Sequence, residues 1–485
     1  MGRRSHQSVR VSAGLRSGTL PAATFDVAVV GAGVVGCAIA RLLARRGCSV
    51  MLLDAADDVG DVTSKASTAI HHTGFDAKPG TLESGLVRRG HALLREYAEA
   101  VGIPLATPGA LLVAWTAAEE AALPGIAANA EANGYARARP VALDELRARE
   151  PELGGGARAA LEIPDEGIVC PWTTTLALAT EALQAGASLA LCARVLAVRA
   201  GPPGDAHALA TTRGDVFARR VVNAAGLGSD EVDRMFGHDA FTITPRRGEL
   251  VVFDKLARPL IDHILLPVPT GRTKGVLVAP TVYGNVLLGP TAEDVDRKDE
   301  RRTTEAGLAG LFAAGERILP ALGEHEVTAT YVGLRAATEH VDYQFRAHDE
   351  QGYVCVGGVR STGLSAALAL AEHTAEALGD AGLGLAPEHD APPITMANIG
   401  ELAPRPYAQP ERIAADPEYG RVVCFCERVT AGELRDALAS RIPPVSPEGL
   451  RRRTRALMGR CQGFYCGAAV TAALADAAQE HEHDR

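Results

Sequence analysis

Residues 25–54 carry apolar positions in an order that predicts a strand, a helix and a second strand. Val27–Val30 is a continuous apolar run typical of a buried strand, and Val50–Leu53 is another. Between them, apolar side chains recur at helical spacing from Val35 to Leu43. The segment therefore predicts a βαβ unit.

Three glycines with the spacing G-x-G-x-x-G lie between the first strand and the helix, and an aspartate ends the second strand. The first glycine permits a tight turn, the second lets the backbone approach a pyrophosphate, and the third lets the helix pack close to the strand. The helix N-terminus offers free N–H groups and a positive dipole end to the phosphates. The aspartate is placed to accept hydrogen bonds from a ribose. The predicted dinucleotide contacts are Gly31, Gly33, Val34, Val35, Gly36 and Asp54. This unit alone leaves FAD and NAD open.

The pattern further along the chain predicts two interleaved α/β domains. Helical periods alternate with strands as far as residue 240, whereas Pro and Gly punctuate the strands of 242–288, as in an antiparallel sheet. We expect a Rossmann-like dinucleotide-binding domain interleaved with an antiparallel-sheet substrate domain. The dinucleotide-binding parts are expected at about 25–76, 155–240 and 325–380, and the substrate parts at about 77–154 and 241–324.

The ends of the chain differ from this core. Residues 1–24 are basic and rich in Ser and Gly, without the apolar stretch of a secretory signal, and predict a disordered leader. Residues 381–420 are rich in proline and predict a linker. Residues 421–478 predict a small helical domain, in which Thr430 and Glu433 have capping-box spacing. Residues 479–485 predict a frayed tail.

Composition narrows the class of protein. The chain has 485 residues, 47% hydrophobic and 22% charged, which is ordinary for a globular protein. Its net charge of -10 argues against a general nucleic-acid binder. No apolar run approaches the ~18–20 residues of a membrane span. Five of the nine cysteines are scattered in apolar contexts, as expected for buried thiols in a reducing cytoplasm.

The other four cysteines form two closely spaced pairs, C-x-C and C-x4-C. Four thiolates from two short loops can hold a 2Fe-2S cluster or a zinc ion, and zinc ribbons favour a different spacing, C-x2-C. The segments CFCERVTAGEL and TRALMGRCQGFYCG resemble the helical 2Fe-2S domain of the bacterioferritin-associated ferredoxin family. That resemblance implies four cluster ligands, Cys424, Cys426, Cys461 and Cys466.

A cluster exchanges single electrons, which bears on the choice of dinucleotide. A flavin can divide a two-electron step into single electrons and a nicotinamide cannot, so the cysteines favour FAD over NAD. Electrons are then expected to leave through the cluster to a quinone or a second redox subunit. We expect an oligomer or hetero-complex in the cytoplasm, with any membrane association made through a partner.

Several segments together resemble the glycerol-3-phosphate oxidase/dehydrogenase branch of the D-amino-acid-oxidase-like flavoproteins. They are the glycine fingerprint, SKASTAIHHTGFDAKPGTL (64–82), TKGVLVAPTVYGNVLLGP (273–290), YVGLRAAT (331–338) and GGVRSTGLSAALALAEH (357–373). With the cysteine domain added, the chain resembles the catalytic subunits of anaerobic glycerol-3-phosphate dehydrogenases.

The resemblance assigns three catalytic candidates. His72 matches the family's base on the substrate carbinol, a role that suits a group of near-neutral pKa. Lys274 matches a lysine that faces the substrate. Arg335 matches an arginine that grips a phosphate or carboxylate. Each also has a plain structural alternative: a packed histidine, an exposed hairpin lysine and a salt bridge at the edge of the core.

The remaining cofactor candidates come from four loops. Those of the first loop are expected along the pyrophosphate and ribityl chain, and those of the last place N–H groups at a helix N-terminus near the flavin ring. They are Ser64, Lys65, Ser67; Val195; Ala225, Gly226; and Gly358, Arg360, Ser361, Thr362, Gly363 and Leu364.

These features predict an FAD-dependent dehydrogenase that oxidises a secondary alcohol of a small anionic substrate, first of all sn-glycerol 3-phosphate. One alternative is an L-2-hydroxy acid such as 2-hydroxyglutarate, or an amine or imino acid, on the same scaffold. A second is a non-catalytic electron-transfer subunit.

Overall fold

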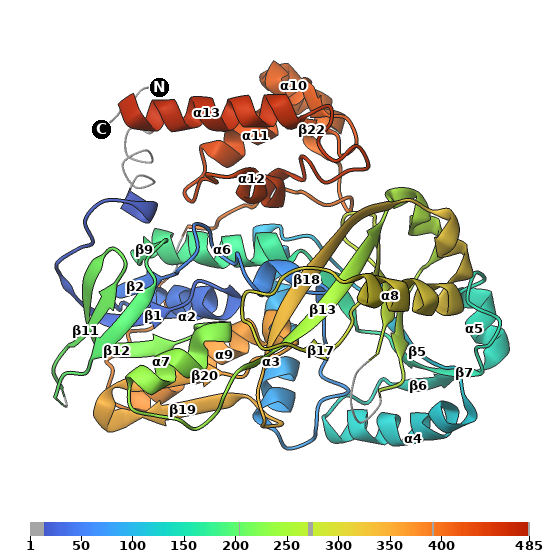
Figure 1. Ribbon diagram of the computed structural model, residues 1–485, viewed down its shortest axis with the longest axis horizontal. Helices are drawn as coiled ribbons and strands as arrows, with labels where there is room; N and C mark the ends of the chain where they lie inside the picture. Colours follow the sequence, from blue (N-terminus) through green and yellow to red (C-terminus); the bar gives the residue numbers. More distant parts are fainter. Residues whose placement is uncertain (1–13, 203, 270–274, 390–391, 484–485) are drawn as a thin grey trace.

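The computed structural model describes residues 14–483 except 203, 270–274 and 390–391. The body of the molecule holds two large sheets, and the C-terminal helices form a separate layer against it, over helix α6 (Figure 1). Among the described residues, no helix combines the length and the apolar character needed to cross a membrane.

The first sheet is the Rossmann-like part and has eight strands in the order β10-β11-β12-β1-β2-β9, with β20 beside β12 and β19 beside β20. Its centre is parallel: β1 lies between β12 and β2, and β9 and β20 continue in the same direction. Its strands are β1 Thr24–Val30, β2 Val50–Leu53, β9 Ser188–Ala190, β10 Val195–Arg199, β11 His207–Thr211, β12 Gly214–Asn223, β19 Gln344–His348 and β20 Tyr353–Gly357.

Helices cover both faces of this sheet. Val27 and Val29 of β1 face a core shared with α2, α3, α6 and α9, while Ala28 and Val30 face the opposite core, which contains Phe236. This alternation follows from the period-two geometry of a strand. The helices are α2 Val34–Arg45, α3 Leu82–Val101, α6 Pro171–Gln184, α7 Ser229–Met235 and α9 Gly363–Asp380.

The second sheet has nine strands in the order β17-β13-β16-β15-β14-β5-β7-β6, with β18 beside β13. It is antiparallel apart from the parallel pair β14 and β5. Its strands are β5 Ala110–Ala114, β6 Arg139–Val141, β7 Ala159–Ile163, β13 Thr244–Phe253, β14 Ile264–Pro267, β15 Leu277–Pro280, β16 Val286–Gly289, β17 Glu293–Asp294 and β18 Val327–Ala337. The helices α4 Ala117–Ala132, α5 Leu143–Arg149 and α8 Glu305–Ile318 lie around it.

A small sheet joins the two halves of the body; its strands are β3 Ile70–His71, β4 Leu105–Ala106 and β8 Gly167–Val169.

The expected fold class is confirmed, but two expected domain boundaries are wrong. Strands β7 and β18 fall in segments assigned to FAD binding, yet both hydrogen-bond into the second sheet. Short apolar strands look alike in either sheet, and their pairing is set by distant segments.

The predicted disordered leader is wrong for residues 14–23. Leu15 and Leu20 are buried, and the guanidinium of Arg213 donates to the carbonyls of Leu15 and Ser17. Residues 1–13 lie outside the described residues. The predicted tail is also wrong in part, because helix α13 (Gly467–His483) continues through 479–483.

The proline-rich segment 381–420, predicted as a linker, has little regular structure and is packed. Ile399 is buried, and the buried Arg405 forms an ion pair of 2.7 Å with Glu433 of the C-terminal module. The module itself contains β21 Val422–Cys424, β22 Val429–Thr430, α10 Pro410–Ala415, α11 Ala431–Leu438 and α12 Pro447–Thr454. The capping box at Thr430 is present, with the Glu433 side chain accepting from the backbone of Thr430 at 2.9 Å.

Candidate active site and cofactor sites

The glycine loop packs as its spacing requires. Gly31 has a φ of +107°, and a Cβ there would lie 2.3 Å from the carbonyl oxygen of Ala224. A Cβ on Gly36 would lie 1.8 Å from the carbonyl oxygen of Gly31, so α2 can sit this close to β1 only with glycine. These contacts place the N-terminus of α2 at one wall of a cavity of about 350 Å³.

Asp54 lies at the end of β2, as expected, and lines this cavity. Its carboxylate accepts hydrogen bonds from the backbone N–H groups of Ala32, at 2.6 Å, and Ala56, at 2.8 Å. Burial raises its pKa above the usual range of an aspartate. Asp54 thus braces the glycine loop in addition to facing the space predicted for a ribose.

Most of the predicted cofactor residues line this cavity: Gly31, Gly33, Val34, Val35, Asp54, Ser64, Ser67, Val195, Ala225, Gly226, Arg360, Ser361, Gly363 and Leu364. Gly36, Lys65, Gly358 and Thr362 do not. Lys65 instead forms an ion pair with Asp61 at 2.8 Å, and the Thr362 hydroxyl hydrogen-bonds Glu83 at 2.7 Å. Sequence reasoning missed Arg194, Glu231, Lys298 and Arg301, which also line the cavity. Arg194 directly precedes Val195, but no motif marked it.

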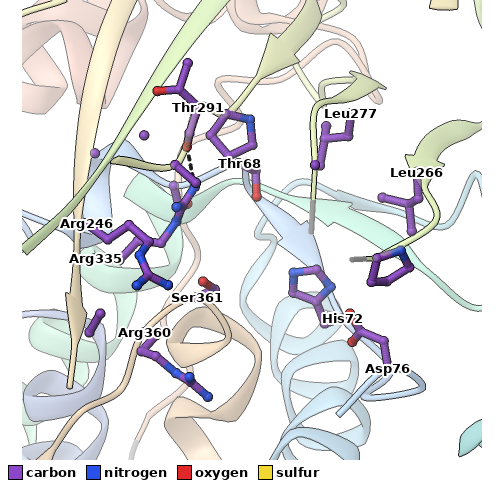
Figure 2. Close-up of a pocket in the computed structure, with 18 of the residues that line it drawn as sticks. Thr68, His72, Asp76, Arg246, Leu266, Leu277, Thr291, Arg335, Arg360 and Ser361 are labelled. Atoms are coloured by element: carbon purple, nitrogen blue, oxygen red, sulfur yellow. Dashed lines mark hydrogen bonds between the residues drawn. The ribbon is translucent and has the colours of Figure 1, made fainter. Parts of the chain in front are cut away.

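A second cavity, of about 470 Å³, adjoins the first. Both are lined by Thr63, Ser67, Arg360 and Ser361, so these residues mark where the two spaces meet. Figure 2 shows His72 and Arg335 at opposite sides of this second cavity, with Leu266 and Leu277 beside the histidine. The structure therefore brings two of the three catalytic candidates to one space.

His72 is held from both its backbone and its ring. Its N–H donates to the Ser365 hydroxyl at 2.8 Å, and its Nδ1 lies 3.2 Å from the Glu166 carboxylate. Glu166 is fully buried and also accepts from the backbone and hydroxyl of Thr73, at 2.7 and 2.8 Å. A carboxylate on Nδ1 fixes the ring so that Nε2 is the free nitrogen. Sequence reasoning missed Glu166, because no motif marks the loop that carries it.

The neighbouring His71 has a structural position. It is fully buried, stacks on His91 with ring centroids 3.9 Å apart, and has Nε2 3.0 Å from the His91 carbonyl oxygen. Burial lowers the pKa of His71 to about 2, and the neighbouring His91 adds to the effect. The adjacent histidines therefore have separate tasks: His71 packs and His72 faces the cavity.

Arg335 extends from β18 into the cavity without an acidic partner among the described residues. Its guanidinium donates to the carbonyl oxygen of Thr291 at 3.3 Å. Burial, together with the charge of Arg246 directly opposite in β13, lowers its pKa to about 10. Gly248 provides the room, since a Cβ there would lie 2.8 Å from Arg335 Nη2. A partly buried cation without a counter-charge suits an anionic ligand.

Three arginines near this space are ion-paired. Arg246 pairs with Asp294 at 2.6 Å, and Arg360 with Glu83 at 3.1 Å. Arg247 pairs with Glu293 and Glu300. Lys274 lies outside the described residues, so its role stays a prediction.

The four C-terminal cysteines lie as two pairs of interacting thiols, Cys424 with Cys466 and Cys426 with Cys461. Burial raises the pKa of Cys424 to about 11, while N–H groups of the 463–465 loop lower that of Cys461. A 2Fe-2S cluster takes two thiolates on each of its two irons, whereas zinc needs four ligands around one ion. Among the described residues no three metal-binding side chains converge on one point. The paired thiols fit a 2Fe-2S cluster.

Comparison with known proteins identifies the class. A model of the FAD dependent oxidoreductase family matches residues 26–377, and a model of the BFD-like 2Fe-2S binding domain matches residues 422–476. The chain belongs to the FAD dependent oxidoreductase family. It binds FAD, and its C-terminal module is a 2Fe-2S domain.

Relatives narrow the class further. The chain is 32% identical over 452 residues to a glycerol 3-phosphate dehydrogenase of Caloramator mitchellensis, covering 93% of this chain and 94% of the relative. It is 26% identical to an L-2-hydroxyglutarate dehydrogenase of Arabidopsis thaliana, over 72% of this chain and 82% of the relative. A solved L-alpha-glycerophosphate oxidase of Mycoplasma pneumoniae, reduced by dithionite and with FAD bound, matches with a TM-score of 0.71 at 26% identity. That match covers 76% of this chain and 97% of the oxidase.

Proposed function

We propose that this protein is a glycerol-3-phosphate dehydrogenase that oxidises sn-glycerol 3-phosphate to dihydroxyacetone phosphate. One observation carries the proposal: His72 and Arg335 both line one cavity, and that cavity adjoins the one proposed to hold FAD. The similarity to the Caloramator dehydrogenase over nearly the whole chain supports the same substrate.

The substrate's two ends meet different chemistry in this cavity. Arg335 binds the anionic end through charge-assisted hydrogen bonds, which are strong where water is excluded. His72 takes the proton of the secondary hydroxyl at Nε2, because Glu166 occupies its Nδ1. Lys274 is proposed to face the same substrate. When bound, FAD supplies the acceptor for the hydride of the carbinol carbon.

The 2Fe-2S module is proposed to carry the electrons onward, one at a time, to a quinone or a second redox subunit. Cys426 and Cys461 are partly exposed, whereas Cys424 and Cys466 are buried. An external acceptor could therefore approach the cluster from the side of Cys426 and Cys461. A hetero-complex in the cytoplasm, reaching the membrane only through its partner, belongs to the same proposal.

Anaerobic bleaching of the flavin absorption band tests the substrate. We expect sn-glycerol 3-phosphate to bleach it at low concentration, and L-2-hydroxyglutarate, glycine and L-proline to bleach it weakly or not at all. Faster bleaching by L-2-hydroxyglutarate would mean that Arg335 binds a substrate carboxylate and not a phosphate. If His72→Ala leaves the activity of a purified complex unchanged, the pocket is not catalytic and the chain serves electron transfer.

The acceptor is tested separately. With substrate present, an artificial one-electron dye should be reduced much faster than oxygen. Cys461→Ser should abolish the visible cluster spectrum and dye reduction while flavin bleaching persists. Equal turnover with oxygen and dye would contradict an exit through the cluster.

A further inference from the structure

Two aromatic side chains lie between the 2Fe-2S module and the flavin-binding body. Trp172, at the start of α6, and Tyr283, in the turn between β15 and β16, stack with ring centroids 5.0 Å apart and planes 16° apart. Tyr283 is buried, and its hydroxyl lies 2.9 Å from the Sγ of Cys170. Neither residue belongs to the substrate cavity or to the cluster ligands.

On the module side, one arginine connects the stack to the cluster loop. Arg455, at the end of α12, lies over the Tyr283 ring with its guanidinium carbon 4.3 Å from the centroid. Its Nε pairs with Glu427 at 2.9 Å, and Glu427 directly follows the ligand Cys426. The backbone N–H of Glu427 also hydrogen-bonds the Cys424 thiol. Arg455 therefore touches the ring and, through one residue, the cluster loop.

On the flavin side, the stack ends at the loop that lines the FAD cavity. The indole N–H of Trp172 donates to the carbonyl oxygen of Lys65 at 3.0 Å. The loop residues Ser64 and Ser67, which flank Lys65, line that cavity, and Ser67 also lines the substrate cavity. The Tyr331 hydroxyl donates to the Ser67 carbonyl at 2.9 Å, which holds the same loop from β18.

The two sides are fixed to each other by buried ion pairs close to the stack. Arg452 and Arg453 of α12 both bind Asp58, at 2.8 and 2.7 Å, and Arg452 also binds Asp61, the partner of Lys65. Buried, hydrogen-bonded ion pairs of this kind resist separation, since each charge would be left without its partner. The stack therefore lies in a fixed, close-packed contact.

We propose that the Trp172–Tyr283 stack is the medium through which electrons cross from reduced FAD to the 2Fe-2S cluster. The inference rests on the proposed exit of electrons through the cluster. The anionic flavin that hydride transfer leaves would return to oxidised FAD by giving up two electrons, one at a time, and one proton to solvent. A bound 2Fe-2S cluster would take each electron singly and hand it to a one-electron acceptor before the next. No bond of Trp172 or Tyr283 forms or breaks, and the guanidinium against Tyr283 disfavours removing an electron from that ring.

Trp172→Leu and Tyr283→Leu test this path, because each removes a ring and keeps an apolar side chain. FAD is photoreduced anaerobically, so the result does not depend on the substrate, and the reduced cluster is followed by its electron paramagnetic resonance signal. We expect cluster reduction to be severalfold slower in both variants. Tyr283→Phe should be close to the unmodified protein, because the stack is retained. Bleaching of the flavin by glycerol 3-phosphate should be unchanged in all three.

Tyr97→Leu is the matched control, since Tyr97 is also a buried tyrosine with a guanidinium, that of Arg41, over its ring at 4.7 Å. It should leave cluster reduction unchanged. FAD and iron content are measured for every variant, and methionine replaces leucine at any position where the leucine variant loses a cofactor. Cluster reduction at the unmodified rate in variants of both rings, with both cofactors retained, would overturn the proposal. If glycerol 3-phosphate does not bleach the flavin of the unmodified protein, but the cluster is reduced after photoreduction as expected, only the proposed substrate is contradicted.

Discussion

Two arginine sites in this molecule differ in what balances their charge. Arg453, at the interface between the module and the body, is buried and donates twice to the Asp58 carboxylate, at 2.7 Å each, and to the carbonyls of Ile442 and Gly449. Arg335 in the substrate cavity donates to one carbonyl and has no carboxylate partner among the described residues. The first charge is neutralised by the fold itself, whereas the second has no counter-charge among the described residues. The contrast separates an arginine that holds the structure from one that is proposed to bind the substrate.

Asp58→Asn should have the largest effect, and on stability. Removing this carboxylate leaves two buried guanidinium groups facing each other, so we expect the free energy of unfolding to fall by about 3–5 kcal/mol. Chemical denaturation followed by circular dichroism measures it. The pKa of Asp58 is lowered to about 2 by the two arginines, so its stabilising effect is present above about pH 4 and is lost as the pH falls toward 2. Asp57→Asn, the same change one residue away, is the control and should be nearly neutral. Equal stability of Asp58→Asn and Asp57→Asn would mean that the ion pairs of Asp58 with the arginines of α12 do not stabilise the fold.

Arg335→Met should do the opposite, reducing catalysis and sparing stability. Two charge-assisted hydrogen bonds to the substrate anion contribute about 1.5–3 kcal/mol each, so kcat/KM should fall by at least about a hundredfold. The free energy of unfolding should stay the same or rise, because an unbalanced charge is removed from a partly buried position. Arg246→Met is the matched control: it lies opposite Arg335 in the sheet but is paired with Asp294. A comparable loss in Arg246→Met, or a less stable Arg335→Met, would mean that Arg335 is not reserved for the substrate.

Glu166→Gln sharpens the comparison, since Glu166 is a buried carboxylate whose partner, His72, is the proposed catalytic base. The amide keeps the shape and loses the charge that orients the imidazole. We expect kcat to fall about tenfold to a hundredfold, less than the full 10²–10⁴ that a general base contributes because His72 itself is kept, with KM nearly unchanged. Steady-state kinetics with a one-electron dye separate the two constants. A rise in KM alone would place Glu166 in substrate binding instead.

The sequence predicted the parts of the fold that depend on local order. The glycine loop, Asp54 and the start of α2 follow from residues close together in the chain, and all line one cavity. The assignments of β7 and β18 failed because strand pairing joins segments far apart, which periodicity does not reveal. Residues 14–23 were expected to be disordered, yet Arg213, about 200 positions away, holds their carbonyls.

The candidate site shows the same limit. His72 and Arg335 were found because motif-like segments carry them, and both line the cavity. Glu166 was missed because its role is set by its distance to His72, 94 positions earlier in the chain. Lys65 was placed on the right loop, but its ammonium pairs with Asp61 at 2.8 Å instead of facing the cofactor cavity. A side chain's direction depends on partners that local sequence does not name.

His71→Leu should have the smallest effect at neutral pH, and it compares two neighbouring histidines, the packed His71 and the proposed base His72. The pKa of His71 is lowered to about 2 when folded, against about 6.5 when unfolded, so below about pH 6.5 the unfolded chain binds a proton that the folded chain excludes. Stability should therefore fall by about 1.4 kcal/mol per pH unit from this residue as the pH drops below 6.5. His71→Leu removes the proton-binding group, so its stability relative to the unmodified protein should improve steadily between pH 6.5 and pH 4.5 in chemical denaturation. A difference that does not change with pH would show that His71 accepts a proton in the folded protein. In that case both histidines, and not His72 alone, would be available for proton transfer.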